Sequence, residues 1–188
     1  MHLYLVMSSP TSSNLNGVTI IEMLVTLAVL AVLATLAAPS FRLLHEKWSV
    51  DSVAQSMHST LLMARSEAIK RGGGIGIQKN ANSTSCTNAS TNQEWGCGWF
   101  IYNDTNNNGT WNAAEPKLYE LQLAGKVNIM HNSGGSALKV DRYGMVNGLN
   151  ARGFTLSPES MGIASSATSS LCMSSGGRIR VIRSASCQ

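Results

Sequence analysis

An apolar stretch near the N-terminus constrains this chain more than any other feature. Residues 18–38 contain a single charged side chain, Glu22, and Pro39 follows directly. As a helix the stretch would be roughly 31 Å long, which is about the thickness of the hydrocarbon core of a bilayer. The proline predicts a kink or a weak point in that helix. We therefore expect an N-terminal helix whose first half spans a membrane.

Glu22 is the unusual residue of this stretch. A carboxylate inside an apolar span costs a few kcal/mol, about 3 on insertion scales, and the nearby sequence offers it no partner. If the chain is cut after Gly17, the new amino group of Val18 lies one helical turn from Glu22 and can neutralise it, in the same chain or in a neighbour. A secretory signal peptide has a shorter apolar run preceded by basic residues, and a plain anchor has no use for Glu22. The pattern indicates a helix that packs against copies or relatives of itself.

Residues 17–22, GVTIIE, resemble the prepilin signature of the type IV pilins: a glycine, a hydrophobic residue, threonine, two apolar residues and glutamate. The resemblance implies that a prepilin peptidase removes residues 1–17 as a leader, cutting after Gly17 and methylating Val18. It also implies that Glu22 serves filament assembly. Two features depart from the family pattern, since Val18 stands where phenylalanine is usual and the leader lacks lysine and arginine.

The four cysteines are Cys86, Cys97, Cys172 and Cys187. Their number is even, no C-x-x-C pair occurs, and an exported chain reaches an oxidising compartment. Two disulfide bonds are therefore expected rather than a metal site or free thiols. Four cysteines allow three pairings, of which proximity in sequence favours Cys86–Cys97 and Cys172–Cys187.

The remainder of the chain predicts a helix followed by short strands. Val53, Met57, Leu61, Ala64 and Ala68 form one apolar stripe at helical spacing, and three glycines at 72–74 end the helix. Beyond them, short apolar runs separated by Gly and Asn predict an antiparallel sheet or a small sandwich, with a central strand over 95–102 and a flexible loop over 160–170. The expected parts are a leader (1–17), a transmembrane and assembly helix (18–38), a periplasmic helix (39–71) and an antiparallel β domain (72–188).

Three blocks extend the resemblance to nearly the whole mature chain. They are ARSEAIKRG at 64–72, the Gly, Trp, Phe, Tyr, Asp, Asn and Glu pattern at 98–115, and a Gly- and Arg-rich C-terminal strand. Together they resemble the FimT/GspH family of minor pilins of type IV pili and minor pseudopilins of type II secretion. The resemblance implies an α+β fold, a long N-terminal pilin helix packed on an antiparallel β-sheet or sandwich domain. It further implies a single-pass inner-membrane protein with its C-terminal domain in the periplasm, which joins other major and minor pilins in a pilus.

The C-terminal third is basic and ends in an arginine motif. Residues 138–188 hold six bases and two acids, which suggests an anionic partner. On a strand, Arg178 and Arg180 project from one face while Ile179 and Val181 pack on the other. Members of the FimT branch that act in natural transformation carry a G-R-x-R motif and bind DNA with it, and Gly177–Arg180 matches that motif. The weaker candidates to extend this surface are Arg183, Lys139, Arg142 and Arg152.

We therefore expect binding to the phosphate backbone of double-stranded DNA, without sequence preference and sensitive to salt. No aromatic residue lies within 172–187, so base stacking is not expected. The alternative interpretation of the arginines is that they keep an exposed edge strand soluble. The alternative function is a GspH-type minor pseudopilin with a purely structural role in type II secretion.

Residues 104–115 fit the spacing of an EF-hand calcium loop. The candidate ligands are Asp104, Asn106, Asn108 and Glu115, with Gly109 at the turn position. Strands rather than helices should flank the segment, however, and a hairpin loop explains the same residues. Calcium is therefore kept as an alternative, and no other cofactor is expected. The chain carries no nucleophile elbow, phosphate loop or Cys/His metal spacing, so we expect no enzyme.

Overall fold

The computed structural model describes residues 17–132, 134–146, 152–174 and 177–187. The predicted leader, 1–17, lies outside these residues except for Gly17. The chain divides into two compact units, Met1–Phe41 and Arg42–Gln188. Each unit is considered separately below.

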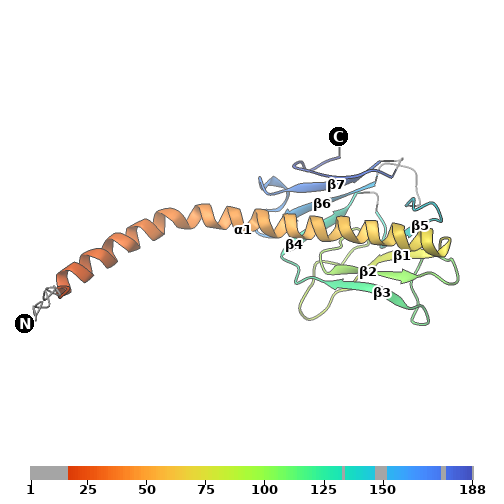
Figure 1. Ribbon diagram of the computed structural model, residues 1–188, viewed down its shortest axis with the longest axis horizontal. Coiled ribbons are helices and arrows are strands. Elements are labelled where there is room, and N and C mark those ends of the chain that lie inside the picture. The colour runs from red at the N-terminus through yellow and green to blue at the C-terminus, as the bar shows by residue number, and fades with distance from the viewer. Residues whose placement is uncertain (1–16, 133, 147–151, 175–176, 188) are drawn as a thin grey trace, which may run out of the picture. The chain divides into compact units, whose positions relative to one another are not determined.

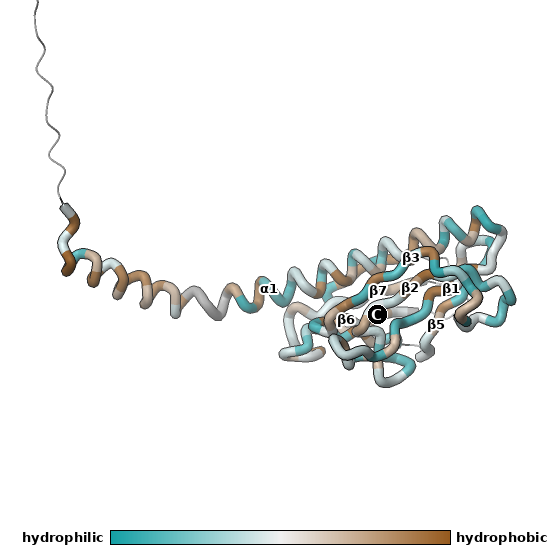
Figure 2. Tube along the Cα trace, turned by 90° about the horizontal axis from the view of Figure 1, so that it is seen from below, coloured by the Kyte–Doolittle hydropathy of each residue, from teal (hydrophilic) through white to brown (hydrophobic). Residues whose placement is uncertain are grey.

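The first unit contains the start of helix α1 (Ile20–Arg71). Its apolar side chains are exposed around the helix, including Ile20, Leu24, Leu27, Leu30 and Leu33, and Figure 2 shows this stretch as predominantly hydrophobic. Within the described residues, no single helix has both the length and the hydropathy of a membrane span. The pair Ile20–Leu36 and Phe41–Arg71 passes that test together by length and composition.

In the second unit, the remainder of α1 packs on two sheets (Figure 1). The predicted apolar stripe forms the contact, because Met57, Leu61, Ala64 and Ala68 are fully buried in the core. Val50 and Ala54 extend it toward the N-terminus, whereas Val53 is only partly buried. The helix ends where predicted, with the N–H of Gly73 donating to the carbonyl of Ala68 at 2.7 Å.

Eight described strands form two antiparallel sheets of four strands each, in the orders β3-β2-β1-β5 and β4-β6-β7-β8. The strands are β1 (Ile75–Lys79), β2 (Gly98–Asn103), β3 (Lys117–Gln122), β4 (Val127–His131), β5 (Ala137–Val140), β6 (Arg152–Pro158), β7 (Ser169–Met173) and β8 (Ile179–Ile182). Every paired strand runs antiparallel to its neighbour. The predicted α+β fold, a long helix on an antiparallel β domain, is therefore confirmed.

The core lies where α1 meets the inner faces of both sheets. Trp95, Trp99 and Phe154 are fully buried there, and the indole N–H of Trp99 donates to Thr60 Oγ1 on α1 at 3.0 Å. Because both partners are buried, this bond satisfies two polar groups that would otherwise be costly. It fixes how the helix lies on the first sheet.

The predicted central strand over 95–102 begins three residues too early. Trp95 precedes β2, and its N–H donates to the carbonyl of Ile129 in β4 of the other sheet at 2.8 Å. The segment before β2 therefore joins the two sheets, although its aromatic and apolar composition resembles a strand.

The predicted loop over 160–170 connects β6 to β7, but it contains regular structure and buried residues. A 3-10 helix, η1 (Gly162–Ala164), is followed by buried Ser165, Ala167 and Thr168, and β7 starts at Ser169. The hydroxyl of Thr168 donates to the carbonyl of Ile163 at 3.2 Å, and Ser165 Oγ accepts the N–H of Ala167 at 3.2 Å. Small hydroxyl residues therefore satisfy the backbone here and allow close packing.

Both disulfide bonds form between the cysteines that lie closest in sequence. Cys86 is bonded to Cys97 and Cys172 to Cys187, with Cα–Cα distances of 5.6 and 5.5 Å. The second bond holds the chain that follows β8 against the outer face of the second sheet. There Thr155 Oγ1 donates to the carbonyl of Ala185 at 3.0 Å, and Ser170 Oγ donates to that of Ser184 at 2.7 Å.

Candidate nucleic-acid interface

Two arginines lie at the edge of the second sheet, Arg180 within strand β8 and Arg178 directly before it. The pairing of β8 with β7 aligns Arg180 with Cys172 and Ile179 with Met173. Ile179 and Val181 pack against the core, so the alternation of the strand directs Arg178 and Arg180 outward, and both are exposed. Neither guanidinium forms an ion pair with any described residue. We call Arg178 and Arg180 together the arginine edge.

A tight turn before β8 is held from α1. The N–H of Gly177 donates to the carbonyl of Ser174 at 2.9 Å, and the N–H of Arg178 donates to Ser174 Oγ at 3.1 Å. Arg65 Nη1 on α1 donates to the carbonyl of Gly177 at 2.5 Å. Gly177 has a φ of +76°, and a Cβ there would lie 3.0 Å from Met145 Sδ and 3.1 Å from Arg65 Nη2. The glycine of the motif is therefore needed for both backbone conformation and space.

Two of the weaker candidates lie on the same side of the molecule as this turn. Arg152 begins β6, whose register aligns it with Met173, and Met173 is in turn aligned with Ile179. Arg142 lies in the turn after β5 that contains Met145, the residue against Gly177. The exposed Arg142 guanidinium lies 5.1 Å from the ring centroid of Tyr143.

The structure gives the other two weaker candidates local partners. Arg183 directly follows β8 and forms an ion pair with Asp51 of α1 at 2.5 Å. Lys139, on β5 of the first sheet, donates to the carbonyl of Asn107 at 2.8 Å and lies 3.7 Å from Asp104 Oδ2. Their charges are compensated by these contacts, which sequence spacing does not reveal.

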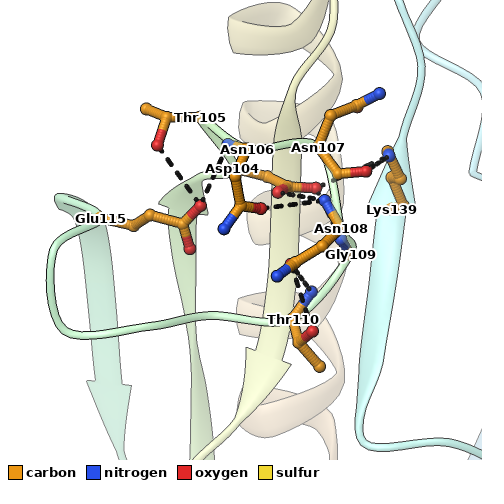
Figure 3. A network of polar contacts seen from close by, with 9 residues as sticks. All are labelled: Asp104, Thr105, Asn106, Asn107, Asn108, Gly109, Thr110, Glu115 and Lys139. Carbon is orange, nitrogen blue, oxygen red and sulfur yellow. Dashed lines mark hydrogen bonds and ion pairs between the residues drawn. The ribbon is translucent and has the colours of Figure 1, made fainter.

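The four calcium candidates come together in one loop between β2 and β3 (Figure 3). The buried carboxylate of Asp104 accepts the N–H groups of Asn108 at 3.0 Å and of Gly109 at 2.9 Å. The buried carboxylate of Glu115 accepts the N–H of Asn112 at 3.1 Å. Asn106 and Asn108 use their side-chain oxygens for N–H groups within the loop, with donors on Asn108 and Thr110.

The loop thus satisfies its own acceptors, and the ammonium of Lys139 supplies the positive charge beside Asp104. Over the described residues, no group of three or more His, Cys, Asp or Glu side chains is arranged to hold a metal ion. The geometry favours the hairpin-loop interpretation of 104–115, in which the carboxylates order the backbone.

At the N-terminus, Glu22 has a local partner that the sequence interpretation missed. The N–H of Glu22 donates to Thr19 Oγ1 at 3.3 Å, and the N–H of Thr19 lies 3.5 Å from Glu22 Oε2. This reciprocal pair is a capping box, and its S/T-x-x-E pattern was present in the sequence. Thr19 is therefore a hydrogen-bond partner for Glu22 before any cleavage, although no nearby partner was expected from the sequence.

Comparison with known proteins places these features in a family. The family model described as "Type II transport protein GspH" matches residues 53–185. The chain belongs to the GspH family. A second model, described as "Prokaryotic N-terminal methylation motif", matches residues 13–38. The chain is therefore a minor pilin or pseudopilin of a type IV pilus or a type II secretion system, a structural and non-enzymatic protein.

Solved structures of two proteins resemble this GspH family member. Two crystal forms of the type IV minor pilin FimU from Pseudomonas aeruginosa are 20% and 21% identical, with TM-scores of 0.55 and 0.53. They cover 73% and 70% of this chain, and 90% and 91% of their own. The minor pseudopilin EpsH of the type 2 secretion system of Vibrio cholerae is 16% identical, with a TM-score of 0.48 over 71% of this chain and 95% of its own. None of the curated proteins compared matches the chain.

Family membership has consequences for processing and assembly. Pilins of this kind co-assemble with other pilins and are processed by a prepilin peptidase, and the methylation motif with its hydrophobic helix is consistent with an inner-membrane prepilin. Sequence reasoning missed Arg65 and Met145 as neighbours of the arginine motif. No sequence pattern indicates that Arg65 contacts Gly177, because the two residues are 112 positions apart.

Proposed function

We propose that this GspH family member is a minor pilin of a type IV pilus that binds double-stranded DNA through Arg178 and Arg180 during natural transformation. The observation that carries the proposal is the arginine edge itself. Its two exposed guanidiniums form no ion pair with any described residue, and they belong to β8 and the residue directly before it, within the loop that the Cys172–Cys187 disulfide bond closes. Guanidinium groups bind phosphate oxygens strongly and without reading the sequence.

The N-terminal parts are proposed to act as in other pilins. The peptidase cuts after Gly17 and methylates Val18, residues 18–38 hold the protein in the inner membrane, and residues 39–71 and the β domain lie in the periplasm. After assembly the protein is part of the pilus, where Glu22 pairs with the N-terminus of its own or a neighbouring helix. Several subunits that each bind weakly would hold DNA tightly, because linked sites act at high effective concentration.

The experiment measures binding of the oxidised full chain, in non-ionic detergent, to a labelled duplex over a salt series. The variant Arg178→Ala/Arg180→Ala removes the arginine edge. Arg42→Ala/Lys126→Ala removes the same charge from a pocket beside β4, at the opposite edge of the second sheet. We expect the first variant alone to lose binding, with a slope of log K against log salt that is smaller by about 2. Equal losses in both variants, or no binding by the wild type at low salt, would contradict the proposal.

The second candidate is a minor pseudopilin of a type II secretion system, favoured by the family description. In that function the arginine edge only keeps β8 from pairing with other strands. Absence of DNA binding, together with loss of secretion when the gene is deleted, would support this candidate.

A further inference from the structure

An exposed aromatic residue lies at the tip of the turn between β5 and β6. Within this turn, residues 141–146, Asp141 Oδ1 accepts the N–H groups of Tyr143 at 2.9 Å and Met145 at 2.8 Å. The N–H of Gly144 also donates to the carbonyl of Asp141 at 2.9 Å. These bonds fix the backbone of the tip, and they leave the side chain of Tyr143 68% exposed. We call residues 141–146 the Tyr143 turn.

The Tyr143 turn is packed against the end of α1. Gly144 has a φ of +75°, and a Cβ there would lie 3.1 Å from Ile69 Cδ1 and 3.5 Å from Arg65 Cβ. This close approach needs a glycine. The tip is therefore held by the helix below it as well as by Asp141.

Arg65 connects the Tyr143 turn to the arginine edge. It packs beneath Gly144, and its guanidinium donates to the carbonyl of Gly177, the residue directly before Arg178. Met145 of the Tyr143 turn lies against Gly177 as well. Two segments that are more than thirty residues apart in sequence, 141–146 and 177–180, thus lie side by side around one arginine of α1.

The surface they form combines two chemical groups. The Tyr143 ring, with the Arg142 guanidinium 5.1 Å from its centroid, offers a flat face for stacking. The arginine edge offers two guanidiniums for phosphates. Stacking platforms beside basic groups are typical of sites for single-stranded nucleic acid, because the bases of a duplex already stack on one another and leave no face free.

We propose that this surface binds single-stranded DNA more tightly than duplex DNA, with Tyr143 stacking on a base and Arg178 and Arg180 binding phosphates of the same strand. The proposal rests on the proposed DNA-binding function and adds the form of DNA that the site prefers. It also changes the expectation from sequence that no aromatic residue takes part, since the fold brings the Tyr143 turn against Gly177 through Met145.

The test uses the oxidised full chain in non-ionic detergent at one fixed salt concentration, with three probes of equal phosphate number. These are a labelled oligothymidylate single strand, a duplex, and a single strand in which the bases are replaced by abasic sites. We expect the oligothymidylate to bind at least about fivefold more tightly than the abasic strand, the gain typical of one stacked base. The duplex should resemble the abasic strand.

Variants separate stacking from charge. Tyr143→Ala should lower oligothymidylate affinity at least about fivefold and leave duplex affinity unchanged, whereas Tyr143→Phe should retain the preference. Because the side chain is exposed, unchanged circular dichroism and thermal midpoint are expected for both variants. If all three probes bind equally and Tyr143→Ala affects none, this proposal is overturned while the proposed function stands. If no probe binds the wild type, the proposed function itself fails.

Discussion

At the scale of single residues, Tyr102 is buried with its hydroxyl unpaired. The side chain is fully buried, and its hydroxyl has no hydrogen-bond partner among the described residues. Burial, with the nearby carboxylates of Asp104 and Glu115, raises the pKa of Tyr102 well above its ordinary value. The loop over 104–115 therefore places negative charge near a phenol that cannot easily ionise.

The raised pKa of Tyr102 predicts alkaline destabilisation. An unfolded tyrosine loses its proton near pH 10 while folded Tyr102 keeps it, so above that pH the folded state binds more protons and stability falls, by about 1.4 kcal/mol per pH unit. Tyr102→Phe should remove this decrease of the unfolding free energy with pH. At pH 7 the variant should be as stable as the wild type or more stable, because a buried unpaired hydroxyl is lost. Urea unfolding from pH 7 to 11 measures both effects, with the exposed Tyr143→Phe as control. If the unfolding free energies of wild type and Tyr102→Phe fall equally with pH above pH 10, the raised pKa of Tyr102 is refuted.

Lys139 carries a second prediction at this scale. Its ammonium is 3.7 Å from the fully buried side chain of Asp104. Lys139→Met removes the compensating charge, so we expect a loss of about 1–3 kcal/mol of stability. The exposed Lys126→Met should lose almost nothing. The same unfolding experiment with millimolar calcium tests the loop, and we expect no shift for the wild type. A calcium-dependent rise in its midpoint would restore the metal interpretation.

At the scale of elements, sequence periodicity predicted the features that depend on neighbouring residues, namely helix faces, helix ends and strand faces. The stripe on α1 and its end at the 72–74 glycines follow from helical spacing, and the alternation in β8 correctly assigned Arg178 and Arg180 to the outer face. The strand order of the two sheets was not predictable, because it depends on contacts between distant segments. The packing within the 160–170 segment was not predictable, because Ser and Thr satisfy its backbone by side-chain bonds that composition does not reveal.

The two disulfide bonds allow an element-scale prediction about the arginine edge. Cys172→Ser/Cys187→Ser opens the loop around β8, whereas Cys86→Ser/Cys97→Ser opens a loop before β2. Each should cost about 3 kcal/mol on the chain-entropy model. We expect only the first pair to weaken DNA binding, because it releases the chain behind Arg180. Equal affinities of the two still-folded variants would show that the disulfide bond near β8 has no part in presenting the arginines.

At the scale of the whole molecule, charge and apolar surface lie in different parts of the chain. Residues 18–38 hold one charged side chain, Glu22, while the excess of bases lies in 138–188. The site was therefore only partly predictable. The motif is local in sequence, but Arg65 and Met145 contact it, and Arg183 and Lys139 form ion pairs, through tertiary contacts. This distribution agrees with the proposed division, in which the N-terminal part assembles and the C-terminal part binds DNA.

A substitution at Glu22 tests whether the N-terminal part of the chain serves assembly. In the uncleaved chain it is capped by Thr19, and the proposed cut after Gly17 adds the ammonium of Val18 one turn away. Glu22→Gln keeps the shape and removes the charge, so the variant should still be processed, seen as a smaller band on an immunoblot. Its recovery in sheared pili should fall at least about tenfold, because an ion pair in apolar surroundings is worth more than about 1.4 kcal/mol. Glu67→Gln, which changes a partly buried acid paired with Arg71 on the same helix, should assemble normally. Normal recovery of Glu22→Gln would mean that the capping box, and not pairing with a helix N-terminus, is the role of this carboxylate.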